Sequence, residues 1–391
     1  MQKAEIVIIG GGVVGASVAF HLTRRACRDV LILDREDALG YGSTGKATGG
    51  IRAQFETDIN IKLSLYSLDF IKDWDFNCEY EPRGYLFVAT DEAQLEYLRQ
   101  SSERQRLLGY EGVEIIDAKA IAGMIPGLNC NDIAGGSFGP RDGFINPLAM
   151  LEGFMVGAVS HGARVRTSAL VRSIDVEGGR VTGVRTSEGR LECEKVVVCS
   201  GAWAKTVAAT AGIDLPVEPQ RRQIVWAKAA KALPPALPMV IDLSNGFHFR
   251  PGRDFHVAAD AGDGRDVIFA YPDPEEPASF STDFDEEFIE KVAEKAAHRA
   301  PFLNGASIVY EKCRAGLYEN TPDHHAILGG CEVEGLYFAS GFSGHGVMHS
   351  PATGRALSEI ILDGEASFLD VSSLHIDRFA KGELLYETAF I

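Results

Sequence analysis

Short apolar runs that end in glycine-rich turns are the dominant pattern along the chain. Residues 5–9 and 29–33 are apolar and rich in β-branched side chains, as is typical of fully buried parallel strands. Between them, apolar side chains recur at helical spacing, at Val14, Val18 and Leu22. Residues 5–34 therefore predict one β-α-β unit with a right-handed crossover.

The rest of the chain mixes helical and strand-like patterns. The helical spacing of apolar residues predicts helices over residues 58–74, 92–108, 147–163 and 284–300. Apolar runs predict strands over residues 84–88, 164–186, 195–199, 223–271 and 335–339. Glycine-rich turns follow strands near residues 10, 201 and 341, and ligands collect at the carboxyl ends of strands in doubly wound sheets. This pattern favours an α/β fold whose Rossmann-like domain is interrupted by insertions.

Composition narrows the class of protein. At 391 residues the chain exceeds the usual size of one hydrophobic core, so two structural units are expected. The net charge of -17 argues against nucleic acid as a partner, because phosphates need a basic face. No apolar run reaches the ~20 residues of a transmembrane segment, and the amino terminus lacks a cleavable signal pattern. Seven scattered cysteines without a C-x-x-C pair predict neither a metal site nor a disulfide framework, which favours the cytoplasm.

The turn Gly10-Gly11-Gly12-Val13-Val14-Gly15 has the spacing of a dinucleotide-binding motif, and it follows a strand and opens a helix. Gly10 permits the tight turn, Gly12 lets the backbone approach a pyrophosphate, and Gly15 lets helix and strand pack closely. Asp34 closes the second strand 19 residues after Gly15, where its carboxylate would accept hydrogen bonds from an adenosine ribose. The motif alone does not separate FAD from NAD, so an NAD-dependent dehydrogenase stays open at this point.

Three further segments, together with this unit, resemble the FAD-dependent D-amino acid oxidase superfamily. They are the glycine-rich loop at 42–52, the stretch at 142–147, and the closing Gly341-Phe342-Ser343-Gly344-His345-Gly346. Within the superfamily the chain is most similar to sarcosine oxidases, glycine oxidases, and proline or dimethylglycine dehydrogenases. The resemblance implies a discontinuous FAD-binding domain and a second, α+β substrate domain on a mostly antiparallel sheet. The FAD-binding domain would comprise residues 1–80, 146–216 and 322–391, and the substrate domain residues 81–145 and 217–321.

The resemblance also implies a set of residues that bind the cofactor. Beside the glycine turn, with Val13 and Val14, residues along the pyrophosphate and flavin would be Arg35, Ser43, Thr44, Lys46, Ala47, Thr48, Gly49 and Gly50. Ser200, Gly201 and Trp203 would border the cofactor, and Val171 would either contact the adenine region through its backbone or pack in the core. The pyrimidine end of the flavin would lie against Gly341, Gly344, His345, Gly346, Val347 and Met348. His345 would add charge there or only hold the turn.

An amino acid substrate needs its carboxylate fixed, and a guanidinium fork suits that task. By resemblance, Arg52 and Arg314 stand at the right places, although each could instead form a surface ion pair. Gly316 occupies the place of the cysteine that links covalently to the flavin in monomeric sarcosine oxidases, which predicts noncovalent FAD. Met348 replaces a carboxylate-binding lysine of those enzymes, so recognition is expected to shift to Arg314. His248 and Arg250 either line the substrate pocket or pair across a strand.

These features predict an FAD-dependent enzyme that oxidises the C–N bond of a small amino or N-methyl/imino acid. Hydride equivalents would pass to flavin N5, and water would hydrolyse the imine. The electron acceptor would be dioxygen or an electron-accepting protein, with a partner subunit as one possibility. A flavin-binding subunit of a hetero-oligomeric dehydrogenase complex is the alternative, and it would need neither Arg52 nor Arg314.

Overall fold

A computed structural model describes residues 2–253 and 263–387, and a parallel sheet forms its centre. Residues 254–262 of the predicted strand-like stretch over 223–271 therefore lie outside the described residues. The same holds for residues 1 and 388–391 of the predicted FAD-binding domain. The strand order in this sheet is β20 (Ile327–Gly330), β21 (Leu336–Ser340), β13 (Lys195–Val198), β2 (Ile6–Ile9), β3 (Val30–Leu33) and β9 (Arg164–Arg166). All neighbours are parallel except β20 and β21.

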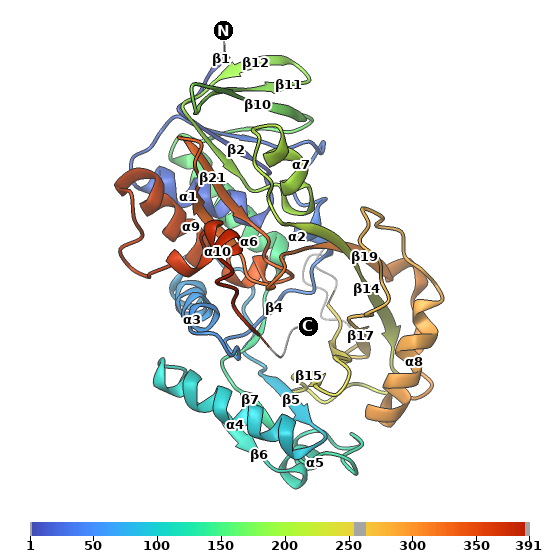
Figure 1. Cartoon of the computed structure of the whole chain (residues 1–391). Helices are drawn as coiled ribbons and strands as arrows, with labels where there is room; N and C mark the ends of the chain where they lie inside the picture. The colour runs from blue at the N-terminus through green and yellow to red at the C-terminus, as the bar shows by residue number, and fades with distance from the viewer. Residues whose placement is uncertain (1, 254–262, 388–391) are drawn as a thin grey trace.

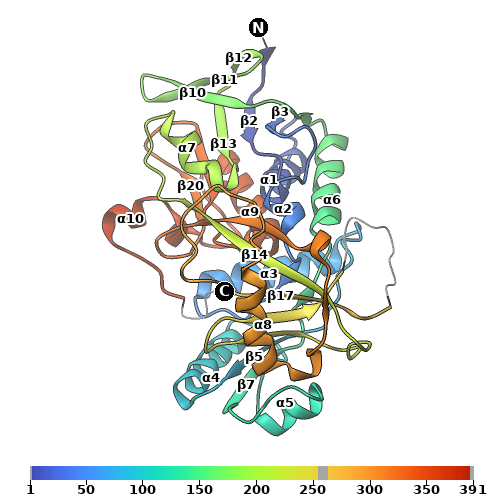
Figure 2. The same cartoon turned by 90° about the vertical axis from the view of Figure 1, so that its right-hand side faces the viewer.

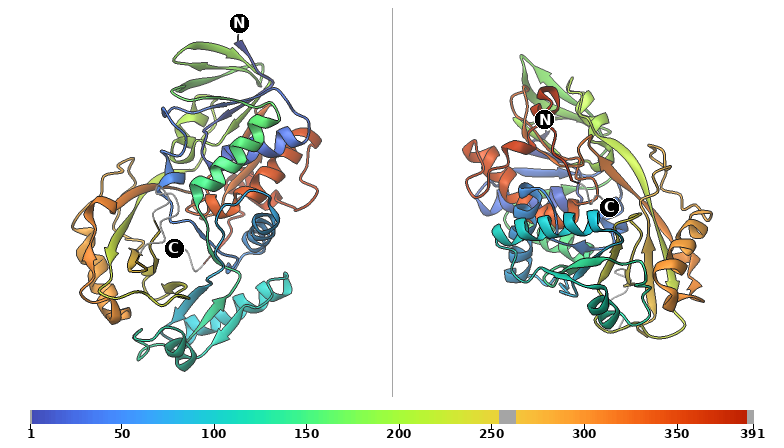
Figure 3. Two further views of the ribbon diagram at one scale, coloured as in Figure 1. Left: turned by 180° about the vertical axis from the view of Figure 1, so that it is seen from behind. Right: turned by 60° about the horizontal axis from the view of Figure 1, so that its bottom comes forward.

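Both faces of the parallel sheet are covered, which explains its continuous apolar strands. Ile6 and Ile8 point toward a layer of helices, whereas Val7 and Ile9 point the other way. The helices of that layer are α1 (Val13–Arg24), α3 (Asp58–Asp73), α6 (Pro147–Ser160) and α9 (Gly346–Asp363). Figure 1 shows α1 beside α9, and the view from behind in Figure 3 shows α6 running along α1.

The opposite face lies under a smaller sheet and a short helix. This sheet has the order β1 (Gln2–Lys3), β12 (Gly189–Glu192), β11 (Arg180–Thr186) and β10 (Val171–Glu177), and the helix is α7 (Ala204–Ala209). Ile174, Val184 and Ala208 pack there against the central strands. The β-α-β unit that the sequence predicts is thus enclosed on both sides.

The second half of the molecule is built on a long, mostly antiparallel sheet (Figure 2). In the described part of the chain its order is β18 (Ser307–Ile308), β14 (Glu218–Lys228), β17 (Asp266–Ala270), β16 (His248–Pro251), β15 (Met239–Asp242), β5 (Tyr85–Ala89), β7 (Gly135–Gly139) and β6 (Glu114–Ile116), with β19 (Arg314–Asn320) also on β14. Its helices are α4 (Glu92–Leu107), α5 (Ala118–Met124) and α8 (Phe288–Arg299). The remaining elements are short: α2 (Ser43–Lys46), α10 (Asp377–Lys381), and the two-stranded pair of β4 (Gly50–Ile51) and β8 (Gly143–Phe144).

The predicted fold class is therefore confirmed: parallel and antiparallel sheets occur in one mixed α/β structure. The domain boundaries inferred from the sequence stay a proposal, although β14 begins and β19 ends close to two of the expected changes of domain. None of the helices within residues 2–253 and 263–387 has the length and apolar character needed to cross a bilayer.

Candidate functional site

One cavity opens where the carboxyl ends of the parallel strands meet the long sheet. Ile9 of β2, Leu33 of β3 and Cys199 after β13 form its floor on the parallel side. On the other side its walls come from the strands β14, β15, β16, β17 and β19. The cavity therefore lies at the carboxyl ends of the parallel strands, where ligands are expected in doubly wound sheets.

The glycine turn shapes one end of this cavity. Gly10 has a φ of +110°, which favours glycine, and a Cβ at Gly15 would lie only 2.0 Å from the carbonyl oxygen of Gly10. Gly10, Gly12, Val13 and Val14 line the cavity, whereas Gly15 is not among the described lining residues and lets α1 pack against β2. Gly12 has no side chain to cap α1, and the amino terminus of this helix adjoins the cavity.

Asp34 and Thr44 fix the position of this turn. The Asp34 carboxylate accepts hydrogen bonds from the backbone N–H of Gly11, at 2.7 Å, and of Glu36, at 2.9 Å. Thr44 Oγ1 accepts from the backbone N–H of Val13 at 3.1 Å. Because Asp34 also lines the cavity, its remaining lone pairs are available to hydroxyl groups of a ligand.

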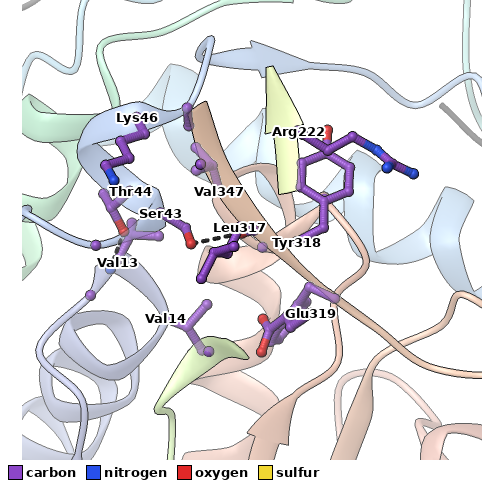
Figure 4. A pocket seen from close by; sticks show the side chains of 18 of the residues that line it. Val13, Val14, Ser43, Thr44, Lys46, Arg222, Leu317, Tyr318, Glu319 and Val347 are labelled. Atoms are coloured by element: carbon purple, nitrogen blue, oxygen red, sulfur yellow. Dashed lines mark hydrogen bonds between the residues drawn. The ribbon is translucent and has the colours of Figure 1, made fainter. Parts of the chain in front are cut away.

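The glycine-rich loop after β3 forms the next part of the wall. Its predicted residues all line the cavity: Ser43, Thr44, Lys46, Ala47, Thr48, Gly49 and Gly50. Ser43 Oγ donates to the carbonyl oxygen of Leu317 on β19 at 2.8 Å, which joins the loop to the long sheet (Figure 4). A Cβ at Gly49 would lie 2.1 Å from the carbonyl oxygen of Ile145, so only glycine fits there. Burial lowers the pKa of Lys46.

A second group of predicted residues borders the cavity near β10 and β13. Ser200, Gly201, Trp203 and Val171 all line it. The Arg35 guanidinium lies 3.5 Å from the centre of the Trp203 ring, and the indole provides a flat apolar wall. Val171 is half-buried and also packs against the core, and its contact with the adenine region stays a prediction.

Three buried polar atoms on the cavity wall have no hydrogen-bond partner among the described residues. They are Ser200 Oγ, Glu319 Oε2 and Arg222 Nε. A buried polar group without a partner costs about 1–3 kcal/mol, so such atoms indicate a polar ligand. The Ser200 hydroxyl and the Glu319 carboxyl, together with Asp34 and the glycine turn along one apolar channel, fit an elongated molecule with phosphates, sugar hydroxyls and an aromatic ring. The residues present therefore fit FAD.

Burial raises the pKa of Glu319 to about 7, against the opposing effect of the Gly341 and Phe342 amides. In the unfolded chain the pKa of a glutamate carboxyl is about 4.3, so the folded state holds the Glu319 proton more tightly. The protein therefore loses stability as pH rises from about 4 to about 7. Replacing Glu319 by glutamine should remove about 3 kcal/mol of this pH dependence. Thermal unfolding of ligand-free protein at pH 5 and pH 8 measures it.

The control for this experiment is Glu103→Gln, on the exposed side of α4. It should follow the wild-type pH dependence throughout. An unchanged difference between pH 5 and pH 8 in Glu319→Gln would show that Glu319 is already ionised in the folded protein.

The end of the cavity next to the carboxyl-terminal glycine segment carries Arg52 and His345. Arg52 is 3% exposed; it donates to the Gln54 carbonyl, lies 3.5 Å from His345 Nε2 and stacks 3.9 Å from the Phe55 ring centre. Burial, and then the charge of Arg52, lower the pKa of His345 well below its usual value. His345 is therefore neutral near pH 7, and both of its predicted roles stay predictions.

The closing segment forms a further part of the cavity wall. Gly344, His345, Gly346, Val347 and Met348 line the cavity. Gly341 does not line it among the described residues; with a φ of +75° it packs against Thr321.

Of the predicted substrate-binding residues outside this segment, His248 lines the cavity with Arg52. Arg314 and Arg250 are not among the described lining residues. Arg314 Nε donates to the Lys46 carbonyl at 3.2 Å, and Arg250 donates to the carbonyls of Thr48 and Pro251. Both arginines support the glycine-rich loop, and a contact of Arg314 with substrate stays a prediction.

Sequence reasoning missed several polar residues of the wall: Tyr85, Arg222, Tyr318 and Glu319. Arg222 and Glu319 lie in strands, where side chains alternate between the two faces. Arg221 and Arg222 are adjacent in a strand, so their side chains must point to opposite faces of the sheet. This pattern could have indicated that one of the two arginines faces the cavity.

Comparisons with known proteins agree with this geometry. The model of a family described as FAD dependent oxidoreductase matches residues 5–360. The chain is 31% identical over 99% of its length to FAD-dependent oxidoreductase domain-containing protein 1 of Xenopus laevis, of which it covers 84%. It is 29% identical over 97% of its length to mitochondrial dimethylglycine dehydrogenase of Mus musculus, of which it covers 44%. The crystal structure of L-proline dehydrogenase from P. horikoshii superposes with a TM-score of 0.89 and 28% identity, over 98% of this chain and 100% of that one.

Proposed function

Because the chain belongs to the FAD-dependent oxidoreductase family, we propose that it oxidises the C–N bond of a small amino or N-methyl/imino acid to an imine. The observation that carries the proposal is the cavity wall, where the guanidinium of Arg52 adjoins His345 of the segment at 344–348. Two of the similar proteins are named for proline and dimethylglycine, both small amino acids with a substituted nitrogen. Their carboxylate suits a buried arginine.

Different residues along the cavity would bind different parts of the cofactor and the substrate. Asp34 would hold ribose hydroxyls, the amino terminus of α1 the pyrophosphate, and the backbone at 344–348 the pyrimidine end of the flavin. When bound, FAD supplies the acceptor for the hydride equivalents at its N5. Arg52 would hold the substrate carboxylate so that the C–H bond faces this acceptor. The amine must be neutral to react, and loss of its proton to solvent before the reaction requires no dedicated base.

The electron acceptor separates two versions of this function. Dioxygen would make the protein an oxidase, and an electron-accepting protein or partner subunit would make it a dehydrogenase. We place the protein in a reducing compartment such as the cytoplasm, because its seven cysteines are all unpaired.

Anaerobic flavin bleaching tests the proposed function directly. Sarcosine, proline, glycine, dimethylglycine and D-amino acids are added in turn to the purified protein, and the loss of flavin absorbance is followed. At least one of these amines should bleach the flavin within seconds to minutes, and admission of air then distinguishes oxidase from dehydrogenase. A colourless protein that reduces NAD would overturn the proposal, and a yellow protein that none of the amines bleaches would favour the flavin-binding subunit.

The flavin is expected to be noncovalent. Gly316 has no side chain to form a link, and a Cβ there would lie 3.2 Å from the Lys46 side chain. Precipitation with acid should therefore leave all the flavin in the supernatant, where its absorbance is measured. Yellow colour that stays with the protein pellet would contradict this expectation.

A further inference from the structure

Two adjacent arginines on β14 have opposite environments. The Arg221 guanidinium forms two hydrogen bonds with the Glu276 carboxylate, at 2.8 and 3.2 Å. Arg222 belongs to the opposite face of the strand and is one of the residues that line the cavity, where Figure 4 shows its side chain beside the Tyr318 ring. One of its terminal nitrogens donates to the Arg221 carbonyl at 3.3 Å, whereas its Nε is buried without a partner among the described residues.

The positive charge of Arg222 is not neutralised by a close carboxylate. Burial lowers its pKa, and the charges of Glu276 and Asp273 oppose this only from a distance. Glu276 is bound to Arg221, and Asp273 is bound to Lys291 at 2.6 Å. Within the described ranges no carboxylate forms an ion pair with Arg222. A half-buried guanidinium with a buried, unpartnered Nε–H is costly unless an anion accepts a hydrogen bond from it.

The surroundings place Arg222 at the substrate end of the cavity. Its guanidinium lies 5.4 Å from the centre of the Tyr318 ring, and Tyr318 packs so closely on Gly344 that a Cβ there would lie 2.4 Å from the ring. The charges of Arg52 and Arg222 both act on His248 and on Tyr318. The two guanidinia therefore face the same region.

Arg52 differs from Arg222 because two buried carboxyl groups and two hydrogen-bond partners interact with its guanidinium. Its charge acts on the buried carboxyls of Asp142 and Glu387, and its donors reach Gln54 and His345. Arg222, unlike these residues, has a buried nitrogen without a hydrogen-bond partner among the described residues.

We propose that Arg222 is the residue that selects a carboxylate on the substrate, through its Nε–H and together with Arg52. This inference rests on the proposed function and deepens it. The preferred substrates are amines that carry a carboxylate, and the matching amides or simple amines are excluded because they leave Nε without a charged acceptor. The resemblance implied that Arg52 and Arg314 bind the substrate carboxylate. In our proposal Arg222 takes the place of Arg314.

A binding titration on the holoenzyme tests the proposal without turnover. Pyrrole-2-carboxylate and pyrrole-2-carboxamide, which cannot reduce the flavin, are titrated while the flavin absorbance is followed. Wild type should prefer the carboxylate, and Arg222→Met should weaken carboxylate binding about 100-fold while leaving the carboxamide unchanged. Arg222→Lys, which keeps the charge but loses the fork, should weaken it about tenfold. The control is Lys228→Met on the same strand, whose ion pair with Asp263 lies at the surface.

Kinetics with an amine that bleaches the wild-type flavin provide the second readout. Arg222→Met should raise KM about 100-fold and change kcat by less than about threefold, because the contact is made equally in the ground and transition states. Flavin content shows that each variant is folded, and the lysine variant serves alone if the methionine variant loses its flavin. Carboxylate binding that equals wild type in Arg222→Met, or in Arg222→Lys in that case, overturns the assignment. If no amine bleaches the wild-type flavin, the proposed function fails, while the titration still decides whether Arg222 binds a carboxylate.

Discussion

Replacing Gly15 by valine is expected to yield a colourless, destabilised protein. A Cβ at this position would lie 2.0 Å from the Gly10 carbonyl oxygen and 3.3 Å from the Cys199 side chain. Neither Gly10 nor Cys199 can move far, because each directly follows a strand of the buried parallel sheet, β2 and β13. We expect a loss of at least about 3 kcal/mol in the free energy of unfolding, together with loss of the cofactor. The ratio of flavin to protein absorbance and the thermal unfolding temperature measure both effects.

The matched control is Gly123→Ala, in α5 of the other half of the molecule. A Cβ at Gly123 would meet no atom within 4 Å, and the position is helical. Alanine should therefore stabilise the protein by up to about 1 kcal/mol and leave the flavin content unchanged. A full complement of flavin in Gly15→Val would show that the glycine turn does not bind the cofactor.

The β-α-β unit was predictable because its signals are local. The strands at 5–9 and 29–33 are observed as Ile6–Ile9 and Val30–Leu33, buried at every position, and the glycine turn between strand and helix fits the motif spacing. The later loop at 42–52 and the segment at 344–348 were identified through resemblance, and they line the same cavity.

Helix α9, by contrast, was not predicted from the sequence. It begins at Gly346 and contains Pro351, and both residue types argue against a helix. The proline cannot donate to the Val347 carbonyl one turn earlier, and the Ser350 hydroxyl donates to that carbonyl instead, at 2.9 Å. Packing against α1 and α3 then favours the helix, a tertiary effect that no local pattern contains.

The contact between Arg222 and Tyr318 on the cavity wall could not be predicted from the sequence, because it also depends on tertiary structure. Arg222 and Tyr318 are about a hundred positions apart, and only the pairing of β14 with β19 brings them together. Which arginine of the doublet faces the cavity depends on the register of that pairing, since a slip of one residue reverses the faces. Arg314, chosen from the sequence, begins the same strand β19 but supports the loop at Lys46.

Replacing Arg52 by methionine is expected to lower kcat/KM for the oxidised amine about 1,000-fold. The guanidinium is held between the Gln54 carbonyl and the rings of Phe55 and Phe87, so its charge is fixed on the cavity wall. In a buried site such a fixed charge acts on the carboxylate at full strength, whereas solvent would screen it. Arg52→Lys should recover part of the loss, and Arg104→Met, which breaks a surface ion pair with Asp58, should have no effect.

The same variant makes a separate prediction about pH. Burial raises the pKa of Asp142 to about 6, and the charge of Arg52 opposes that rise. Without Arg52 the pKa of Asp142 should rise further. A carboxyl whose folded pKa is raised costs stability as pH rises through that pKa, so the deficit of Arg52→Met relative to wild type should be larger at pH 8 than at pH 5. Thermal unfolding at the two pH values measures the deficit. An equal deficit at both would mean that Arg52 does not act on Asp142, and a kcat/KM within threefold of wild type would remove Arg52 from the substrate site.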